Sequence, residues 1–239
     1  MNIPQPQLLQ PHDSAYPAQL QPIFGGLASP DIWYLGNLDL LKAKGVGFCG
    51  SRNASEPGLM IAADCATQLS ERGIAVISGY APGVDMASHE AALAHGGNTV
   101  IVLPEGINHF RIKKTIKALW DWNRVLVISY FPKEAVWRPD RAMDRNRVIV
   151  ALSDAVLVLE ARDRGGTLNA GYCALQMSKP LFVVCFDDMA DGREGNQQLL
   201  HQGGIPLRRS RTSGHAELRR IFEILNTPDG VPPARKLSA

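Results

Sequence analysis

Four short segments of the sequence carry residue types that bind phosphate groups. They are residues 50–52 (GSR), 78–85 (SGYAPGVD), 144–147 (DRNR) and 164–167 (RGGT). Glycine allows a close approach of the backbone, free N–H groups donate to phosphate oxygens, and a guanidinium can hold two oxygens at once. A single segment of this kind is equally typical of a tight turn with a surface arginine. Four of them in one chain indicate an anion-binding site.

Two of the arginines create an electrostatic conflict. Arg145 and Arg147 lie on either side of Asn146, where we expect a helix to begin. Two positive charges are unfavourable beside the positive end of a helix dipole, and a bound anion would resolve the conflict. The alternative is that both arginines pair with acidic residues of the same fold, such as Asp144 or Glu160.

Asp85 and His89 are the residues that could form a catalytic pair, because they lie one helical turn apart. No serine or cysteine nucleophile lies near them in a known motif, so a structural hydrogen bond between the two is the favoured interpretation. The sequence also lacks GxGxxG, GxxxxGK[ST], HExxH and GxSxG motifs. We therefore expect no enzyme: no catalytic residue, no metal and no cofactor.

The four segments follow apolar runs that the pattern assigns to strands. Runs of four to six apolar residues recur, each followed by a glycine-containing turn and then by a stretch with helical spacing. This alternation predicts an α/β fold with an open, mostly parallel, Rossmann-like sheet and helices on both faces. Ligands bind at the carboxyl ends of parallel strands, so the four segments should meet there. The predicted strands lie within 46–52, 74–79, 99–106, 125–130, 155–161 and 180–186, and the predicted helices within 57–72, 84–95, 111–122, 143–154, 164–177, 195–204 and 215–225.

The composition divides the 239 residues into three parts. Residues 41–226 hold the strand and helix pattern, residues 1–40 suggest an extension packed on the first strand–helix unit, and residues 227–239 suggest a flexible tail. No apolar run is long enough to span a membrane and the start lacks a signal-peptide pattern, which favours a cytoplasmic protein. The four cysteines form no CxxC pair, as expected for reduced core residues.

The positive charge is unevenly distributed along the chain. The net charge is only +2, but residues 111–147 hold ten Lys/Arg against four Asp/Glu, and residues 203–220 hold five against one. These two stretches therefore carry +6 and +4, and the remainder carries −8. Such clustering is what an anion-binding surface produces, although a solvated helix face is the ordinary alternative.

Read in order, the turns resemble a known family, the DNA-processing protein A (DprA/Smf) family of the wider SLOG superfamily. The matching strings are GSR at 50–52, SGYAPGVDMASHEAAL at 78–93, DRNRVIVALSDAVLVLEA at 144–161 and GGTLNAGYCAL at 165–175. The resemblance covers roughly residues 16–207. It implies a Rossmann-like domain that binds single-stranded DNA in a basic pocket at the strand ends. It also implies a homodimer and a RecA-type recombinase as partner.

The resemblance transfers to particular residues of this chain. The loop after the third strand departs from the family pattern, because HFRIKK stands in place of a tyrosine–proline turn; Phe110 there could stack a base. Ala170 stands where related phosphoribohydrolases carry a glutamate, which argues against hydrolysis. The candidate nucleic-acid-binding residues are Gly50, Ser51, Arg52, Ser78, Gly79, Gly83, Asp85, Phe110, Lys113, Lys114, Arg145, Asn146, Arg147, Gly165, Gly166 and Thr167.

The sequence therefore predicts a non-catalytic protein that binds single-stranded DNA and acts in DNA processing or recombination. The alternative is a nucleotide-binding sensor or regulator that uses the same turns, including a defence-associated or antitoxin role with a toxin as partner. The two differ in footprint. Strand binding needs several nucleotides and depends on salt, whereas a sensor binds one small nucleotide.

Overall fold

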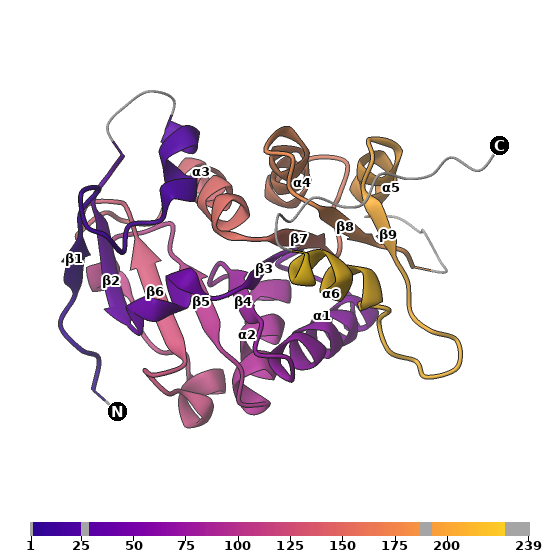
Figure 1. Cartoon of the computed structure of the whole chain (residues 1–239), viewed down its shortest axis with the longest axis horizontal. Coiled ribbons are helices and arrows are strands. Elements are labelled where there is room, and N and C mark those ends of the chain that lie inside the picture. The colour runs from indigo at the N-terminus through magenta and orange to yellow at the C-terminus, as the bar shows by residue number, and fades with distance from the viewer. Residues whose placement is uncertain (1, 25–28, 187–192, 228–239) are drawn as a thin grey trace.

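Nine strands form one sheet in the part of the chain that the structure describes, residues 2–24, 29–186 and 193–227 of a computed structural model. The sheet order is β1-β2-β6-β5-β4-β3-β7-β8-β9, from left to right in Figure 1. The seven strands that follow one another in the sheet from β6 to β9 are all parallel. Strand β2 is antiparallel to β6, and β1 is antiparallel to β2. The strands are β1 (Gln7–Leu9), β2 (Ile32–Gly36), β3 (Gly45–Cys49), β4 (Ala75–Ser78), β5 (Thr99–Val102), β6 (Val125–Ser129), β7 (Ala155–Val158), β8 (Leu181–Val184) and β9 (Ile205–Leu207).

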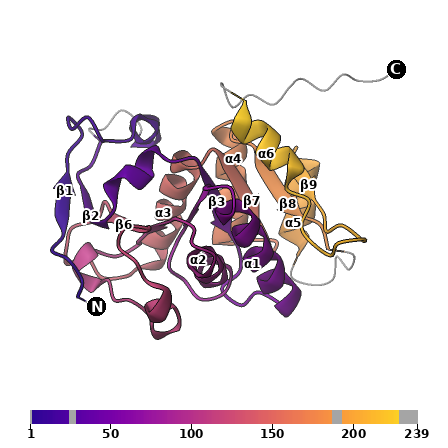
Figure 2. The same ribbon diagram turned by 60° about the horizontal axis from the view of Figure 1, so that its bottom comes forward.

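Six α-helices of the described residues cover the two faces of this sheet (Figure 2). The first face holds α1 (Glu56–Ser70), α2 (Val84–Ala94) and α6 (Arg219–Asn226). The second holds α3 (Pro139–Leu152), α4 (Gly166–Gln176) and α5 (Glu194–His201). Every residue of β3 to β8 is buried, because both faces of these strands are covered. The predicted α/β fold and its six strands are confirmed.

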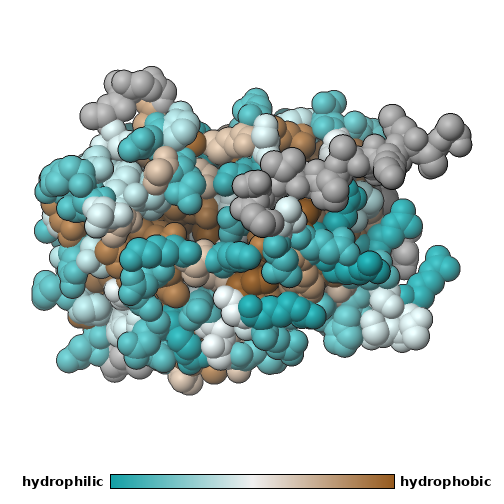
Figure 3. All heavy atoms as spheres, in the orientation of Figure 1, coloured by the Kyte–Doolittle hydropathy of each residue, from teal (hydrophilic) through white to brown (hydrophobic). Residues whose placement is uncertain are grey.

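The alternation of side chains along each strand divides the core between the two faces. Val46 and Phe48 of β3 pack with α1 and α2, whereas Cys49 packs with α3 and α4. In the view of Figure 3 the surface is mostly hydrophilic, with hydrophobic residues visible across its middle. None of the helices in the described residues is long and apolar enough to cross a membrane.

The described part of the amino-terminal extension packs on the core at the edge of the sheet beside β6. There β2 extends the sheet, with Trp33 opposite Ser129 and Gly36 opposite Leu126. A short 3-10 helix, η1 (Ala18–Phe24), lies against α3. Like β1 and β2, the short edge strand β9 has no counterpart among the predicted strands.

The expectation that residues 111–122 form an amphipathic α-helix is wrong. Two short 3-10 helices, η3 (Ile107–His109) and η4 (Lys114–Leu119), connect β5 to β6 instead. Ile116 and Trp120 anchor this connection in the core, next to Phe110. The predicted tail, residues 227–239, lies outside the described residues except for Thr227.

The strand order reverses between β3 and β7. From β3 the chain proceeds through β4, β5 and β6 toward one edge, and then returns to β7 and proceeds through β8 and β9 toward the other. The connections at such a reversal leave in opposite directions and open a crevice at the carboxyl ends of the two strands. This crevice is the place where a ligand site is expected.

Candidate nucleic-acid interface

A pocket of about 370 Å³ lies at the carboxyl ends of β3 and β7. The turns after β3, β4 and β7, the amino-terminal part of α3 and the start of α4 line it. We call it the switch-point pocket. Its volume is within the range of small-ligand sites. Eight of the predicted site residues line it: Gly50, Ser51, Arg52, Asp85, Arg145, Asn146, Gly166 and Thr167.

Two glycines bring the turns after β3 and β4 into contact. Gly83 has a φ of +79°, and a Cβ there would lie 2.3 Å from the carbonyl oxygen of Ser51. The N–H of Val84 donates to that oxygen at 3.3 Å. A Cβ on Gly50 would lie 2.3 Å from a methyl group of Val84. The close packing of these turns, which shapes the pocket, therefore requires glycine at both positions.

Arg145 places a buried positive charge at the pocket. Its side chain is only 6% exposed, and its Nη1 lies 4.0 Å from Asp85 Oδ2, too far for a hydrogen bond. Its Nε has no acceptor among the residues that the structure describes. Burial lowers the pKa of Arg145 and Asp85 opposes this, while Arg52 adds a second positive charge nearby. Arg145 thus has one carboxylate nearby but a buried Nε–H donor that a bound anion would satisfy, and both arginines line the same pocket.

The backbone of Gly79 makes room for this guanidinium. A Cβ on Gly79 would lie 1.9 Å from Arg145 Nη1. His89 fixes the position of Gly79, because its Nε2 donates to the Gly79 carbonyl at 2.6 Å. The other ring nitrogen, Nδ1, lies 2.6 Å from the hydroxyl oxygen of Thr99. The expected hydrogen bond from His89 to Asp85 is therefore wrong: Ala81 N–H donates to Asp85 instead, at 3.2 Å.

An exposed aromatic residue lies at the rim of the pocket, and the sequence analysis missed it. Trp137 is 46% exposed, and the guanidinium of Arg52 lies 5.3 Å from its ring centre. Met143, 42% exposed, also lines the pocket, as do the exposed Arg162 and Arg164. Trp137 lies in the polar stretch KEAVWRPD, which has no apolar periodicity, so the sequence gives no signal of whether its ring is buried or exposed.

The start of α4 supplies backbone donors. Gly165 caps the helix with a φ of +114°, and no side chain caps its first N–H groups. The side chain of Asn146 donates to the carbonyl of Gly166 at 3.2 Å, which fixes α4 against α3. Gly166 and Thr167 line the pocket, so free N–H groups at the positive end of the α4 dipole face it.

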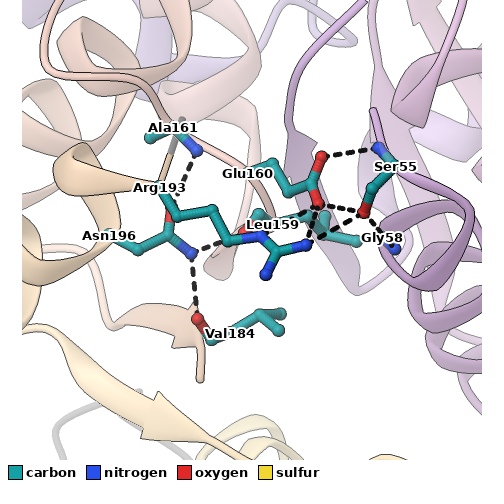
Figure 4. A network of polar contacts seen from close by, with 8 residues as sticks. All are labelled: Ser55, Gly58, Leu159, Glu160, Ala161, Val184, Arg193 and Asn196. Carbon is teal, nitrogen blue, oxygen red and sulfur yellow. Dashed lines mark hydrogen bonds and ion pairs between the residues drawn. The ribbon is translucent and has the colours of Figure 1, made fainter. Parts of the chain in front are cut away.

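The carboxylate of Glu160 lines the pocket but is used in the fold. It accepts from the N–H of Ser55 at 2.8 Å and from the hydroxyl of Ser55 (Figure 4). Arg193 Nη2 lies 3.3 Å from the same carboxylate. Asn196 connects the ends of β7 and β8 by donating to the carbonyls of Leu159 and Val184. Glu160 thus holds the start of α1 to the end of β7.

Two of the predicted contact residues belong to the core. Phe110 is 2% exposed and packs against Tyr80, Trp120 and Trp122, so the prediction that it stacks a base is wrong. Ser78 is fully buried and its hydroxyl donates to the carbonyl of Phe48 at 2.8 Å. It joins β4 to β3 and does not reach a ligand.

The remaining predicted residues lie outside the pocket lining. Helix α3 begins at Pro139, so Arg145 and Arg147 lie in its interior and not at its start. Two residues apart on a helix, they point to different sides, and Arg147 pairs with Asp144 at 3.1 Å. Lys113 Nζ donates to the carbonyl of Tyr80 at 2.5 Å, and Lys114 is exposed.

Residues 7–212 match the protein family described as DNA recombination-mediator protein A. The chain belongs to this family. It is 36% identical over 186 residues to the DNA processing protein DprA of Streptococcus pneumoniae, an alignment that covers 75% of this chain and 64% of that protein. The chain thus spans less than two thirds of the length of this relative.

Solved structures of family members share the fold. A crystal structure of DNA processing protein A from Streptococcus pneumoniae has a TM-score of 0.73 and 30% identity, covering 84% of this chain and 70% of that one. A structure of the Helicobacter pylori protein, described as having a unique single-stranded DNA binding mode, has a TM-score of 0.72 and 23% identity. It covers 93% of this chain and 94% of that one, and shows that the fold extends over nearly the whole chain.

Proposed function

We propose that this protein binds single-stranded DNA in the switch-point pocket and acts in DNA processing or recombination without catalysis. One observation carries the proposal: the guanidinium of Arg145 is buried at the pocket without a hydrogen-bonded carboxylate, beside the exposed Arg52. A phosphate group supplies the missing acceptors. The free N–H groups at the start of α4 supply further donors to the same anion.

The exposed ring of Trp137 favours a nucleic-acid strand over a simple anion. An unpaired base can stack on an exposed aromatic ring next to a phosphate site, whereas the bases of a duplex are already stacked on each other. The charges that hold the phosphates carry no sequence information, so binding is expected to be independent of sequence. The name of the Helicobacter pylori relative, a single-stranded DNA-binding protein, supports the same ligand.

The role in recombination and the absence of catalysis rest on the family. The family is described as DNA recombination-mediator protein A, which supports a role in recombination. The pocket carboxylates support a non-catalytic role, because Asp85 and Glu160 both accept hydrogen bonds from the backbone. A RecA-type recombinase and a second copy of the chain are the partners that we propose with this role.

Fluorescence anisotropy with labelled single-stranded and duplex oligonucleotides tests the proposal. We expect tighter binding of the single strand and a steep loss of affinity between about 50 and about 200 mM salt. Arg52→Ala should weaken binding roughly tenfold, since it removes a charge-assisted contact. Lys42→Ala is the control, because Lys42 is exposed before β3 and pairs with Asp39.

Three results would contradict the proposal. Failure to bind at low salt would exclude a strand ligand, and an affinity that does not change with salt would exclude phosphate contacts. A mononucleotide that competes as well as a long oligonucleotide would favour the small-nucleotide sensor instead.

A further inference from the structure

A second group of arginines follows β9, at the far edge of the sheet. Because β9 is parallel to β8 and β8 to β7, residues after β9 emerge on the side where the switch-point pocket opens. Arg208 and Arg209 follow β9 directly, and Arg211 follows two residues later. We call residues 208–218 the β9–α6 loop. It projects at the lower right of Figure 1, where the surface in Figure 3 ranges from white to teal, that is, from intermediate to hydrophilic.

The β9–α6 loop is held firmly against α1. Asp64 of α1 accepts from the N–H of Ala216 and pairs with the ring of His215, both at 2.6 Å. Gln68, one turn later, donates to the carbonyl of Ala216 at 3.0 Å. Arg209 and Ala216 form an isolated antiparallel bridge across the loop. The loop therefore presents its arginines from a fixed backbone, so little ordering of the backbone is required when a ligand binds.

The arginines of this loop have no acidic partner. Arg208, Arg209 and Arg211 are exposed, and among the described residues no carboxylate lies within 4.0 Å of their guanidinium groups. Arg209 donates to the carbonyl of Gly214 at 2.7 Å, and Arg208 contacts the thiol of Cys185. Glu217 is the single acidic residue of the loop. The loop thus carries three arginines without an acidic partner, and Arg208, which contacts Cys185 directly after β8, lies at the carboxyl side of the sheet.

We propose that the β9–α6 loop is a second contact for the DNA strand that leaves the switch-point pocket. This inference rests on the proposed function. Two strand spacings, roughly 10 Å, separate β9 from β7, a distance that a few nucleotides cover. The pocket anchors one part of the strand, and the loop arginines hold phosphates farther along. Short oligonucleotides reach the pocket alone, whereas longer ones reach both contacts.

The test compares two lengths of labelled oligothymidylate, about four and about twenty nucleotides. Replacing Arg208, Arg209 and Arg211 together by alanine should weaken binding of the long strand about tenfold or more. The slope of log affinity against log salt should fall by about 2, since each single-strand phosphate contact contributes about 0.7. The affinity for the short strand should change less than about twofold, because its phosphates lie in the pocket.

A second triple variant removes the same number of positive charges from residues outside the loop. Lys42, Arg219 and Arg220 are exposed. Arg219 and Arg220 start α6, which leads to the amino side of the sheet, where Lys44 donates to the Leu225 carbonyl. Changing these three residues to alanine should reduce long-strand affinity less than about threefold through net charge alone. Circular dichroism checks that both variants are folded.

The outcomes separate this inference from the proposed function. If the unaltered protein binds both oligonucleotides and the two triple variants weaken the long strand equally, the loop is not a contact and only this inference fails. If the unaltered protein binds neither oligonucleotide, the proposed function fails as well. Selective loss of long-strand affinity in the loop variant supports the second contact.

Discussion

The switch-point pocket and the connection from β5 to β6 (residues 103–124) contain similar residue types, but these residues differ in burial and in hydrogen-bond partners. Both combine arginine or lysine with aromatic residues, and both follow parallel strands of one sheet. In the pocket, Nε of Arg145 has no acceptor among the described residues, and Trp137 is exposed. In the β5–β6 connection, Phe110 is buried and Lys113 donates to the carbonyl of Tyr80.

The difference shows that residue type predicts chemistry, whereas hydrogen-bond partners and burial decide whether that chemistry is available. The fold uses the aromatic rings of the β5–β6 connection to form a core with Trp120 and Trp122, packed next to Leu93 of α2. The exposed ring of Trp137 at the pocket is not part of such a core. Ligand-binding groups are therefore those that the fold positions but leaves without a partner.

Phe110→Ala should show the largest effect, and that effect should be on stability. Truncating a buried phenylalanine costs roughly 3 to 5 kcal/mol, which lowers Tm by roughly 10 °C in a chain of this size. DNA affinity measured well below the transition should remain close to that of the unaltered protein. Thermal unfolding and anisotropy on the same sample make the comparison. A large loss of affinity with unchanged Tm would show that Phe110 contacts DNA after all.

If Phe110→Ala does not fold, Phe110→Leu can be used to test whether Phe110 contacts DNA. Leucine fills part of the same volume, so the loss of stability should be smaller, while a stacking surface for a base would be removed completely. Unchanged affinity in this variant is the expected result.

Acid should destabilise the protein at His89, which lies where the two regions meet. Burial lowers the pKa of His89 to about 4, from 6.5 in an exposed ring. Between these values the unfolded chain binds a proton that the folded chain does not, so stability rises with pH across this window. The contribution lost on going from pH 7 to pH 4 is about 3 kcal/mol. Above pH 6.5 both states are neutral, and this contribution becomes constant.

Urea unfolding at several pH values measures this contribution as a difference between proteins. His89→Gln keeps a donor for the Gly79 carbonyl but does not titrate, so its stability should fall less steeply on acidification. Equal slopes for both proteins below pH 6.5 would mean that His89 is not the group responsible.

Most of the fold could be predicted from the sequence, because parallel strands buried on both faces leave unmistakable apolar runs. The strands β1 and β9 were not predictable in this way, since each has three residues and lies at an edge of the sheet. Edge strands are exposed on one side and need no continuous apolar run. The course of the β5–β6 connection was equally hidden, because its lysines and aromatic residues match an amphipathic helix.

The candidate site could be predicted in part. The turn residues Ser51, Arg52 and Thr167 line the pocket because ligand positions in this architecture follow from strand ends. Arg145 also lines it, although from the interior of α3 and not from a helix start. Trp137 could not be found, because a single aromatic residue in an irregular segment gives no period from which exposure can be inferred.

Trp137→Ala should reverse the pattern expected for Phe110. The side chain is half exposed, so the free energy of unfolding should change by less than about 1 kcal/mol. The affinity for single-stranded DNA should fall by about 1 to 3 kcal/mol, the contribution of one stacked base. Trp137→Phe should recover part of the lost affinity. Anisotropy measures the affinity of both variants. If Trp137→Ala keeps the affinity of the unaltered protein, the pocket holds the strand through phosphate contacts alone.

Lys113→Ala should have the smallest effect. Its Nζ donates to the Tyr80 carbonyl and lies 4.3 Å from the centre of the Tyr80 ring, while burial lowers the pKa of its ammonium group. A lysine already held in this way should release few counterions, so affinity should change less than about twofold.

Lys114→Ala is the matched variant, because Lys114 is exposed on the same connection. We expect Lys114 to contribute more to the salt dependence than its buried neighbour. If Lys113→Ala weakened binding as strongly as Arg52→Ala, its ammonium group would have to leave Tyr80 for the strand. The β5–β6 connection would then belong to the DNA interface. Internal hydrogen bonding would not explain why the switch-point pocket binds DNA and this connection does not.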